Sequence, residues 1–75
     1  MSFLELKSKA NDEFAAGRFD AAIALYSQAL AVPDVAAAER AKALLNRALA
    51  HLRATPANVQ AAIDDCDAAL KLDAS

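Results

Sequence analysis

The side chains that could bind a ligand are few, and most of them carry ammonium, amide or guanidinium donors. Lys7 and Asn11 are four residues apart, so they would share one face of a helix. Asn46 and Arg47 stand together within an otherwise apolar stretch. An ammonium group together with carboxamide donors can hold a carboxylate by charge-assisted hydrogen bonds. The spacing alone leaves open the alternative that these are ordinary solvated side chains on helix surfaces.

Other kinds of chemistry find little support in the sequence. Asp64, Asp65 and Asp67 have the residue type of metal ligands, but no glycine-rich loop or histidine accompanies them, and carboxylates in the middle of a helix usually face water. The only histidine, His51, is expected at the surface or at the rim of a groove, and the only thiol, Cys66, in the core. No serine, histidine and acid stand in the order of a nucleophilic site. We therefore predict no metal, no cofactor and no enzymatic activity.

The composition indicates a small domain in a reducing compartment. The chain has 75 residues, 57% of them hydrophobic, with 22 alanines, one cysteine and a net charge of -2. Its apolar runs are too short to span a membrane, and one cysteine cannot form an internal disulfide. No basic start precedes an apolar block, so no signal peptide is expected. The acidic balance argues against a nucleic-acid partner. These features predict a cytoplasmic protein.

Strong helix formers dominate, and only five β-branched aliphatic residues occur, so the sequence predicts an all-α fold without strands. Ser2 and Glu5 have the spacing of a capping box, and Gly17, the only glycine, stands where a left-handed C-terminal cap belongs. Four helices are predicted, from about Phe3 to Ala16, from Phe19 to Val32, from Val35 to Ala54, and from the Thr55-Pro56 region to about Leu72.

Two further breakers set the later boundaries. Pro33 ends the second helix, and Asp34 is expected to cap the third. Thr55 followed by Pro56 is a helix-starting pair, although Asn58 competes with Thr55 as the cap of the fourth helix.

The second and fourth helices repeat each other at a distance of 40 residues, which is typical of tandem helix-turn-helix units. The recurring positions are Ala22, Ile23, Tyr26, Ala29 and Leu30, followed by Ala62, Ile63, Cys66, Ala69 and Leu70. Small residues at shared positions would let helix axes approach closely. These residues are Ala10, Ala22, Ala29, Ala48, Ala62 and Ala69.

The segment LKSKANDEFAAGRFDAAIALYSQAL resembles the first tetratricopeptide repeat (TPR) of co-chaperone proteins, and ALLNRALAHL with AAIDDCDAALKLD resembles the second. The resemblance implies one domain over residues 1–75, with repeat one at about 3–33 and repeat two at about 35–73. The match is not complete, because the second unit carries about two extra residues around Thr55-Pro56-Ala57. It implies tandem antiparallel helix pairs, an α-solenoid of four helices.

In the co-chaperone branch of that family, a carboxylate clamp holds the C-terminal Glu-Glu-Val-Asp tails of heat-shock chaperones. Lys7, Asn11 and Asn46 match three clamp positions, while the remaining two would lie on a fifth helix beyond Ser75. The resemblance therefore implies a protein-protein interaction module with an incomplete clamp. The predicted peptide-binding residues are Lys7, Asn11, Asn46, Arg47, Phe14 and Leu49.

The fourth helix motivates an alternative function. Its stripe would normally be covered by a following helix, so the chain is expected either to be a fragment of a longer co-chaperone or to form a homo-oligomer through this last helix. The stripe consists of Val59, Ala62, Ile63, Cys66, Ala69 and Leu70. The third helix carries a net charge of +3 and the fourth, with Asp73, a net charge of -3. This asymmetry fits an anionic peptide on the third helix, and it fits equally a simple pairing of the two helices.

Overall fold

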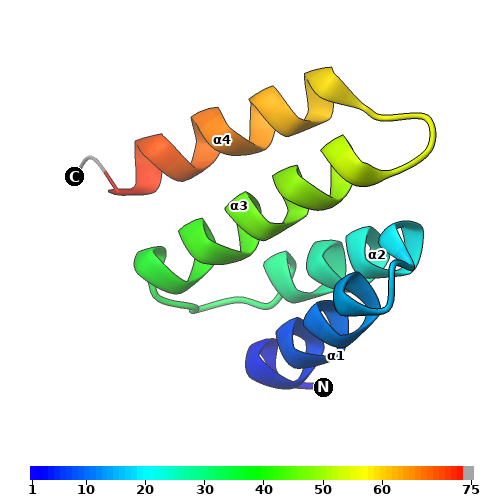
Figure 1. Ribbon diagram of the computed structural model, residues 1–75. Helices are drawn as coiled ribbons and strands as arrows, with labels where there is room; N and C mark the ends of the chain where they lie inside the picture. The colour runs from blue at the N-terminus through cyan, green and yellow to red at the C-terminus, as the bar shows by residue number, and fades with distance from the viewer. Residues whose placement is uncertain (74–75) are drawn as a thin grey trace.

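The computed structural model describes residues 1–73 and shows four α-helices, with no strand in that part of the chain (Figure 1). The chain folds into two helical hairpins in which α2 packs on α1, α3 on α2 and α4 on α3. This confirms the predicted all-α fold of tandem hairpins. None of the four helices is long and apolar enough to cross a membrane. The helices are α1 (Phe3–Ala15), α2 (Phe19–Leu30), α3 (Ala37–Arg53) and α4 (Val59–Asp73).

The first hairpin begins and turns as its capping residues predict. The Ser2 hydroxyl oxygen accepts a hydrogen bond from the Glu5 backbone N–H (3.1 Å), and the Ser2 N–H donates to the Glu5 carboxylate (3.3 Å). These two bonds satisfy donors that the first turn of any helix leaves without partners. Gly17 has a φ of +80°, the left-handed conformation that ends α1 and lets the chain return as α2.

The connection between the hairpins differs from its prediction. The helix α2 ends at Leu30 rather than Val32, and α3 begins at Ala37 with Ala36 as its N-cap and no side-chain cap. Asp34 is therefore not the cap. It adopts a left-handed φ of 62° instead. Val32 and Val35 pack against the core formed by the first two helices and α3, so burying these two valines fixes the path of the connection, and an aspartate tolerates the left-handed turn between them.

The helix α4 is capped by Asn58 and not by Thr55. The Asn58 side-chain oxygen accepts a hydrogen bond from the Ala61 N–H (3.1 Å), and Thr55 lies within the connection. That connection spans residues 54–58, two residues longer than the connection over residues 16–18 in the first hairpin. The second hairpin therefore carries the two extra residues that its sequence indicates.

The core is built largely from alanines at the contacts between helices. All six predicted close-packing alanines are buried: Ala10, Ala22, Ala29, Ala48, Ala62 and Ala69. The buried positions of α1 recur in α3 after 38 residues, in the pairs Phe3/Ala41, Leu6/Leu44 and Ala10/Ala48. Ala22 and Ala29 of α2 recur as the buried Ala62 and Ala69 of α4 after 40 residues, and the difference of two residues corresponds to the longer second connection. The two hairpins thus present equivalent faces.

Several large apolar residues of α3 and α4 lie at the surface, those of α4 in the stripe that was expected to lack a covering helix. Leu45, Leu49 and Leu52 on α3 are about half exposed, and Val59, Ile63 and Leu70 on α4 are half exposed or more. Cys66 is half-buried rather than in the core. The reason is geometric, because each stripe is wider than the contact between α3 and α4, and the alanines occupy that contact. Conversely, Asp65 is buried, although mid-helix carboxylates usually face water.

Candidate functional site

A pocket of about 220 Å³ opens where α1, α2 and α3 meet. Its volume is below the roughly 300–1,000 Å³ of sites for drug-sized ligands, so it has room for one or two side chains of a peptide. Three helices supply its lining, and four of the six predicted binding residues contribute to it. The lining residues are Asn11, Phe14, Tyr26, Asn46 and Leu49.

A buried tyrosine hydroxyl ties the two pocket amides together. The Tyr26 hydroxyl donates a hydrogen bond to the side-chain oxygen of Asn11 and also bonds with Asn46. Burial raises the pKa of Tyr26 above its ordinary value of 10.0, while the bond with Asn46 acts in the opposite direction. The hydroxyl therefore stays protonated at neutral pH. Because the Asn11 oxygen accepts this bond, the Asn11 amide nitrogen is the group left to donate to a ligand.

Lys7 lies one turn before Asn11 on α1, and its side chain is largely covered, with 16% exposed. Its ammonium nitrogen lies 3.5 Å from a carboxylate oxygen of Glu39 on α3, and Lys42 lies 3.5 Å from the other oxygen. Glu39 thus stands between two ammonium groups at the edge of the groove between α1 and α3. An anionic ligand at Lys7 would compete with Glu39 for the ammonium.

The apolar side of the pocket carries an additional cation. The Phe14 ring meets the Phe19 ring edge-on, with centroids 5.2 Å apart. The guanidinium carbon of Arg53, at the end of α3, lies 5.6 Å from the centre of the Phe14 ring. A cation over an aromatic face is a favourable arrangement, and it places a second positive group beside the pocket. Arg53 therefore joins Lys7 as a candidate contact for an acidic peptide.

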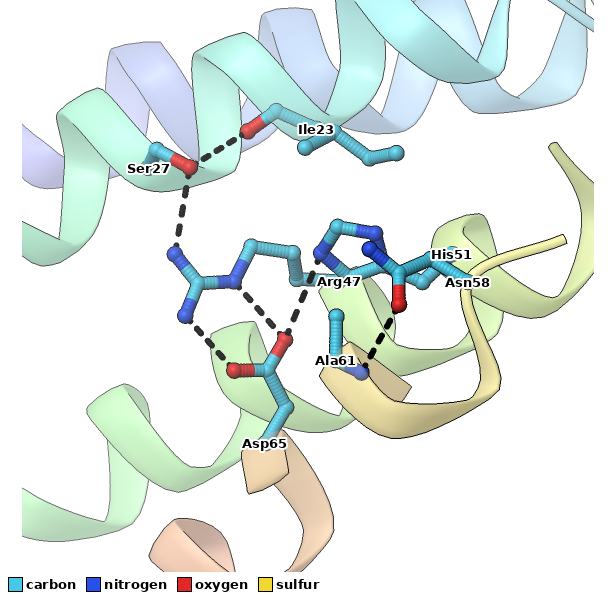
Figure 2. Close-up of polar contacts among 7 residues, drawn as sticks. All are labelled: Ile23, Ser27, Arg47, His51, Asn58, Ala61 and Asp65. Carbon is cyan, nitrogen blue, oxygen red and sulfur yellow. Dashed lines mark hydrogen bonds and ion pairs between the residues drawn. The ribbon is translucent and has the colours of Figure 1, made fainter. Parts of the chain in front are cut away.

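Arg47, in contrast, reaches toward Ser27 of α2 and Asp65 of α4 (Figure 2). Its guanidinium donates two hydrogen bonds to the Asp65 carboxylate, at 2.8 and 2.6 Å, and one to the Ser27 hydroxyl oxygen at 3.1 Å. The bonds with Asp65 raise the pKa of Arg47 further above its ordinary value. With both carboxylate oxygens engaged, Arg47 joins α2, α3 and α4 rather than the peptide groove, and we leave it out of the candidate site.

The histidine His51 also lies beside Asp65. His51 Nε2 lies 3.9 Å from an Asp65 carboxylate oxygen, and its side chain is 16% exposed. His51 therefore lies beside the Arg47–Asp65 pair and not at the rim of the peptide groove. The opposite charges of the third and fourth helices had two explanations, an anionic peptide on the third helix or contact between the two helices. The structure shows that the two helices pack against each other.

A second hollow, of about 440 Å³, lies between the α1–α2 turn and the end of α3, but it contains none of the predicted site residues. Within residues 1–73 no three histidine, cysteine, aspartate or glutamate side chains gather in a way that could hold a metal ion. The structure thus brings Asn11, Phe14, Asn46 and Leu49 into one pocket, with Lys7 outside it, one turn away on α1 and paired with Glu39, and it separates Arg47 from them.

Sequence reasoning missed three residues of the groove: Tyr26, Glu39 and Arg53. Tyr26 was expected in the buried stripe, where it does lie, and only the packing shows that its hydroxyl reaches the pocket. Glu39 carries a weak signal, because it is the only acid on a basic helix. Arg53 has no signal, since its contact with Phe14 joins residues 39 positions apart.

Comparison of the chain with models of protein families, with curated proteins and with solved structures finds no match. The arguments about function therefore rest on the residues and their geometry.

Proposed function

We propose that this chain is a cytoplasmic, non-enzymatic protein-protein interaction module that binds the acidic C-terminal end of a partner in the groove between α1 and α3, as TPR co-chaperones do. The observation that supports this best is the shared pocket, in which Asn11, Phe14, Asn46 and Leu49 converge from separate helices. The resemblance to the TPR family suggests chaperone tails ending in Glu-Glu-Val-Asp as the ligand.

The proposed binding uses both the polar and the apolar part of the groove. The terminal carboxylate accepts hydrogen bonds from the amide nitrogens of Asn11 and Asn46, and Lys7 turns from Glu39 toward the same carboxylate. Phe14 and Leu49 contact the aliphatic side chain near the peptide end. Arg53 is close enough to Phe14 to meet an acidic residue of the peptide. Tyr26 does not contact the ligand but holds the two amides in place.

Weak affinity is expected. The Lys7 ammonium must leave Glu39, and the gain from an exposed ion pair in water is only about 0.2–1 kcal/mol. The pocket itself accepts little more than one or two side chains, so few contacts add to the carboxylate bonds. A dissociation constant on the order of 0.1–1 mM follows.

Isothermal titration calorimetry with a Met-Glu-Glu-Val-Asp peptide tests this function. Substituting Asn46→Ala or Lys7→Ala should weaken binding several-fold. Lys9→Ala is the matched control, because Lys9 is an exposed lysine of the same helix that lies outside the pocket. The same peptide with an amidated C-terminus should lose most of the affinity, since the terminal carboxylate is the proposed anchor.

Two results would contradict the proposal. One is the absence of binding up to millimolar peptide. The other is an amidated peptide that binds as well as the free acid, or a Lys9→Ala variant that weakens binding as much as Lys7→Ala does, because either would indicate general attraction between charges and no defined site.

A further inference from the structure

The second hairpin exposes an apolar face on the side away from α2. On α4 three exposed residues and the half-buried Cys66 follow the spacing i, i+4, i+7, i+11, and on α3 two exposed leucines lie seven apart, so each set forms one stripe. With 3.6 residues per turn, both stripes lie away from the side on which Arg47 and Asp65 meet, so they belong to the same face. We call this the far face. It consists of Leu45, Leu52, Val59, Ile63, Cys66 and Leu70.

The matching face of the first hairpin is covered by a helix. At the 40-residue offset, the α4 stripe corresponds to Phe19, Ile23, Tyr26 and Leu30 of α2, and each of these is buried or half-buried. The helix α3 packs there, with Ala43 in the same core cluster as Ala29 and Leu30. The far face therefore has the residue pattern of a helix-docking surface, with buried alanines between two apolar ridges.

A second copy stacked head-to-tail does not fit this face. The residues of α3 that meet α2 include Ala43 and Arg47. At the 38-residue offset the corresponding residues of α1 are Glu5 and Lys9, both of them charged and exposed. Docking the α1 of one copy on the far face of another would bury these polar groups against leucines, at a cost of several kcal/mol. The two ends of the molecule are not complementary to each other.

The charges next to the far face favour a symmetric pair. Lys42 on α3 and Asp67 on α4 are exposed, and each lies about 60° around its helix from a far-face leucine, Leu45 and Leu70 respectively. If a second copy turns about a two-fold axis parallel to the helices, α3 of one copy lies on α4 of the other, and Lys42 meets Asp67. A two-fold axis across the helices would instead place α4 on α4 and bring like charges together. An isologous contact requires a self-complementary surface, and the far face meets that condition in the first arrangement.

We propose that the far face is a dimer interface, in which two copies of this chain form a four-helix bundle with α3 of each copy packed antiparallel on α4 of the other. The apolar residues of the far face form the centre of the bundle, and Lys42 of each copy faces Asp67 of the other. The interface lies beside the peptide groove and does not include its polar residues. It therefore stands independently of the proposed function.

Sedimentation equilibrium with a pair of matched leucine variants tests the proposal. Leu70 in the far face is 67% exposed, and Leu4 on α1 is 69% exposed, so neither substitution removes core packing. The wild type should be a dimer, Leu70→Asp should raise the dimer dissociation constant at least about 100-fold, and Leu4→Asp should leave it unchanged. Circular dichroism checks that both variants keep their helices.

A wild type that stays monomeric up to about 200 µM overturns the proposal. The far face would then be a binding surface for a helix of another protein. An equal effect of both leucine variants, or growth beyond a dimer, overturns it as well. Lys7→Ala should leave the dimer intact, so loss of peptide binding and loss of dimerisation remain distinguishable.

Charge reversal tests the orientation. Asp67→Lys should weaken the dimer at least about fivefold, because the contact occurs twice in a symmetric pair, and adding Lys42→Glu to the same chain should restore it. Unchanged affinity after Asp67→Lys overturns the packing of α3 on α4, because a dimer with like helices facing each other gains nothing from its original charges.

Discussion

Replacing Asp65 by alanine should destabilise the fold far more than replacing its neighbour Asp64. The two residues have the same type and adjacent positions, but their surroundings differ. Asp65 has 8% of its side chain exposed and holds the Arg47 guanidinium with both oxygens, at 2.6 and 2.8 Å. Asp64 is exposed, with Gln60 donating to it at 2.9 Å. The comparison isolates the tertiary contact from any effect of removing an aspartate from a helix.

The expected magnitude follows from what the substitution leaves behind. Removing one partner of a fully buried ion pair costs about 3–5 kcal/mol, because the other charge stays unpaired. The Arg47 side chain is 22% exposed, so water can reach part of the freed guanidinium. We therefore expect a loss of about 2–4 kcal/mol for Asp65→Ala and less than about 0.5 kcal/mol for Asp64→Ala. For a domain of this size the first value lowers Tm by about 10–25 °C.

Urea denaturation followed by circular dichroism measures both free energies of unfolding. A double variant, Arg47→Met with Asp65→Leu, should recover most of the loss, because an apolar pair of similar volume avoids the unpaired charge. If Asp65→Ala costs less than about 1 kcal/mol, or no more than Asp64→Ala, the pair does not join α3 to α4 in solution and the argument is refuted.

Three other outcomes test separate parts of the structure. Glu39→Gln should strengthen peptide binding about two- to fivefold in calorimetry, because it releases Lys7, and a weaker complex would contradict the proposed competition. Gly17→Ala should lower the free energy of unfolding by about 1 kcal/mol, because alanine is strained at the left-handed φ of this position. The added methyl group meets no other part of the chain within 4 Å, so the backbone strain is the only cost. An unchanged midpoint of urea denaturation would contradict this. The bonds with Ser2 lower the pKa of Glu5 from its ordinary value of 4.5, so their stabilisation is present above that pH and is lost as pH falls through the lowered value. Glu5→Gln should therefore flatten the acid side of a Tm–pH profile, and an unaltered profile would refute that origin.

Local signals predicted the helices well because their causes lie within a few residues. The capping box at Ser2 and Glu5 and the left-handed Gly17 were predicted from spacing and residue type, and the structure confirms them. The prediction for Asp34 was wrong because a distant core decided it. Burial of Val32 and Val35 set the path of the connection, and α3 begins after it.

The candidate groove was predictable only in part. The spacing of Lys7 and Asn11 placed them on one face of a helix, and the structure brings Asn11 and Asn46 into one pocket. Their neighbours could not be predicted, since the hydroxyl of Tyr26 and the guanidinium of Arg53 reach the pocket from other turns of the chain. The pairing of these groups depends on how three helices cross.

Taken by itself, the sequence determined four helices, their alternation in two similar hairpins and the alanines that let them pack closely, because periodicity and capping act over one or two turns. It could not distinguish Asp65 from Asp64, or Arg47 from Asn46, because neighbouring residues on a helix differ by about 100° and only the partner helix decides which of them is covered. Tertiary packing joined Arg47 to Asp65, placed Asn46 in the groove, and left Leu45 and Leu52 of α3 exposed beside the α4 stripe.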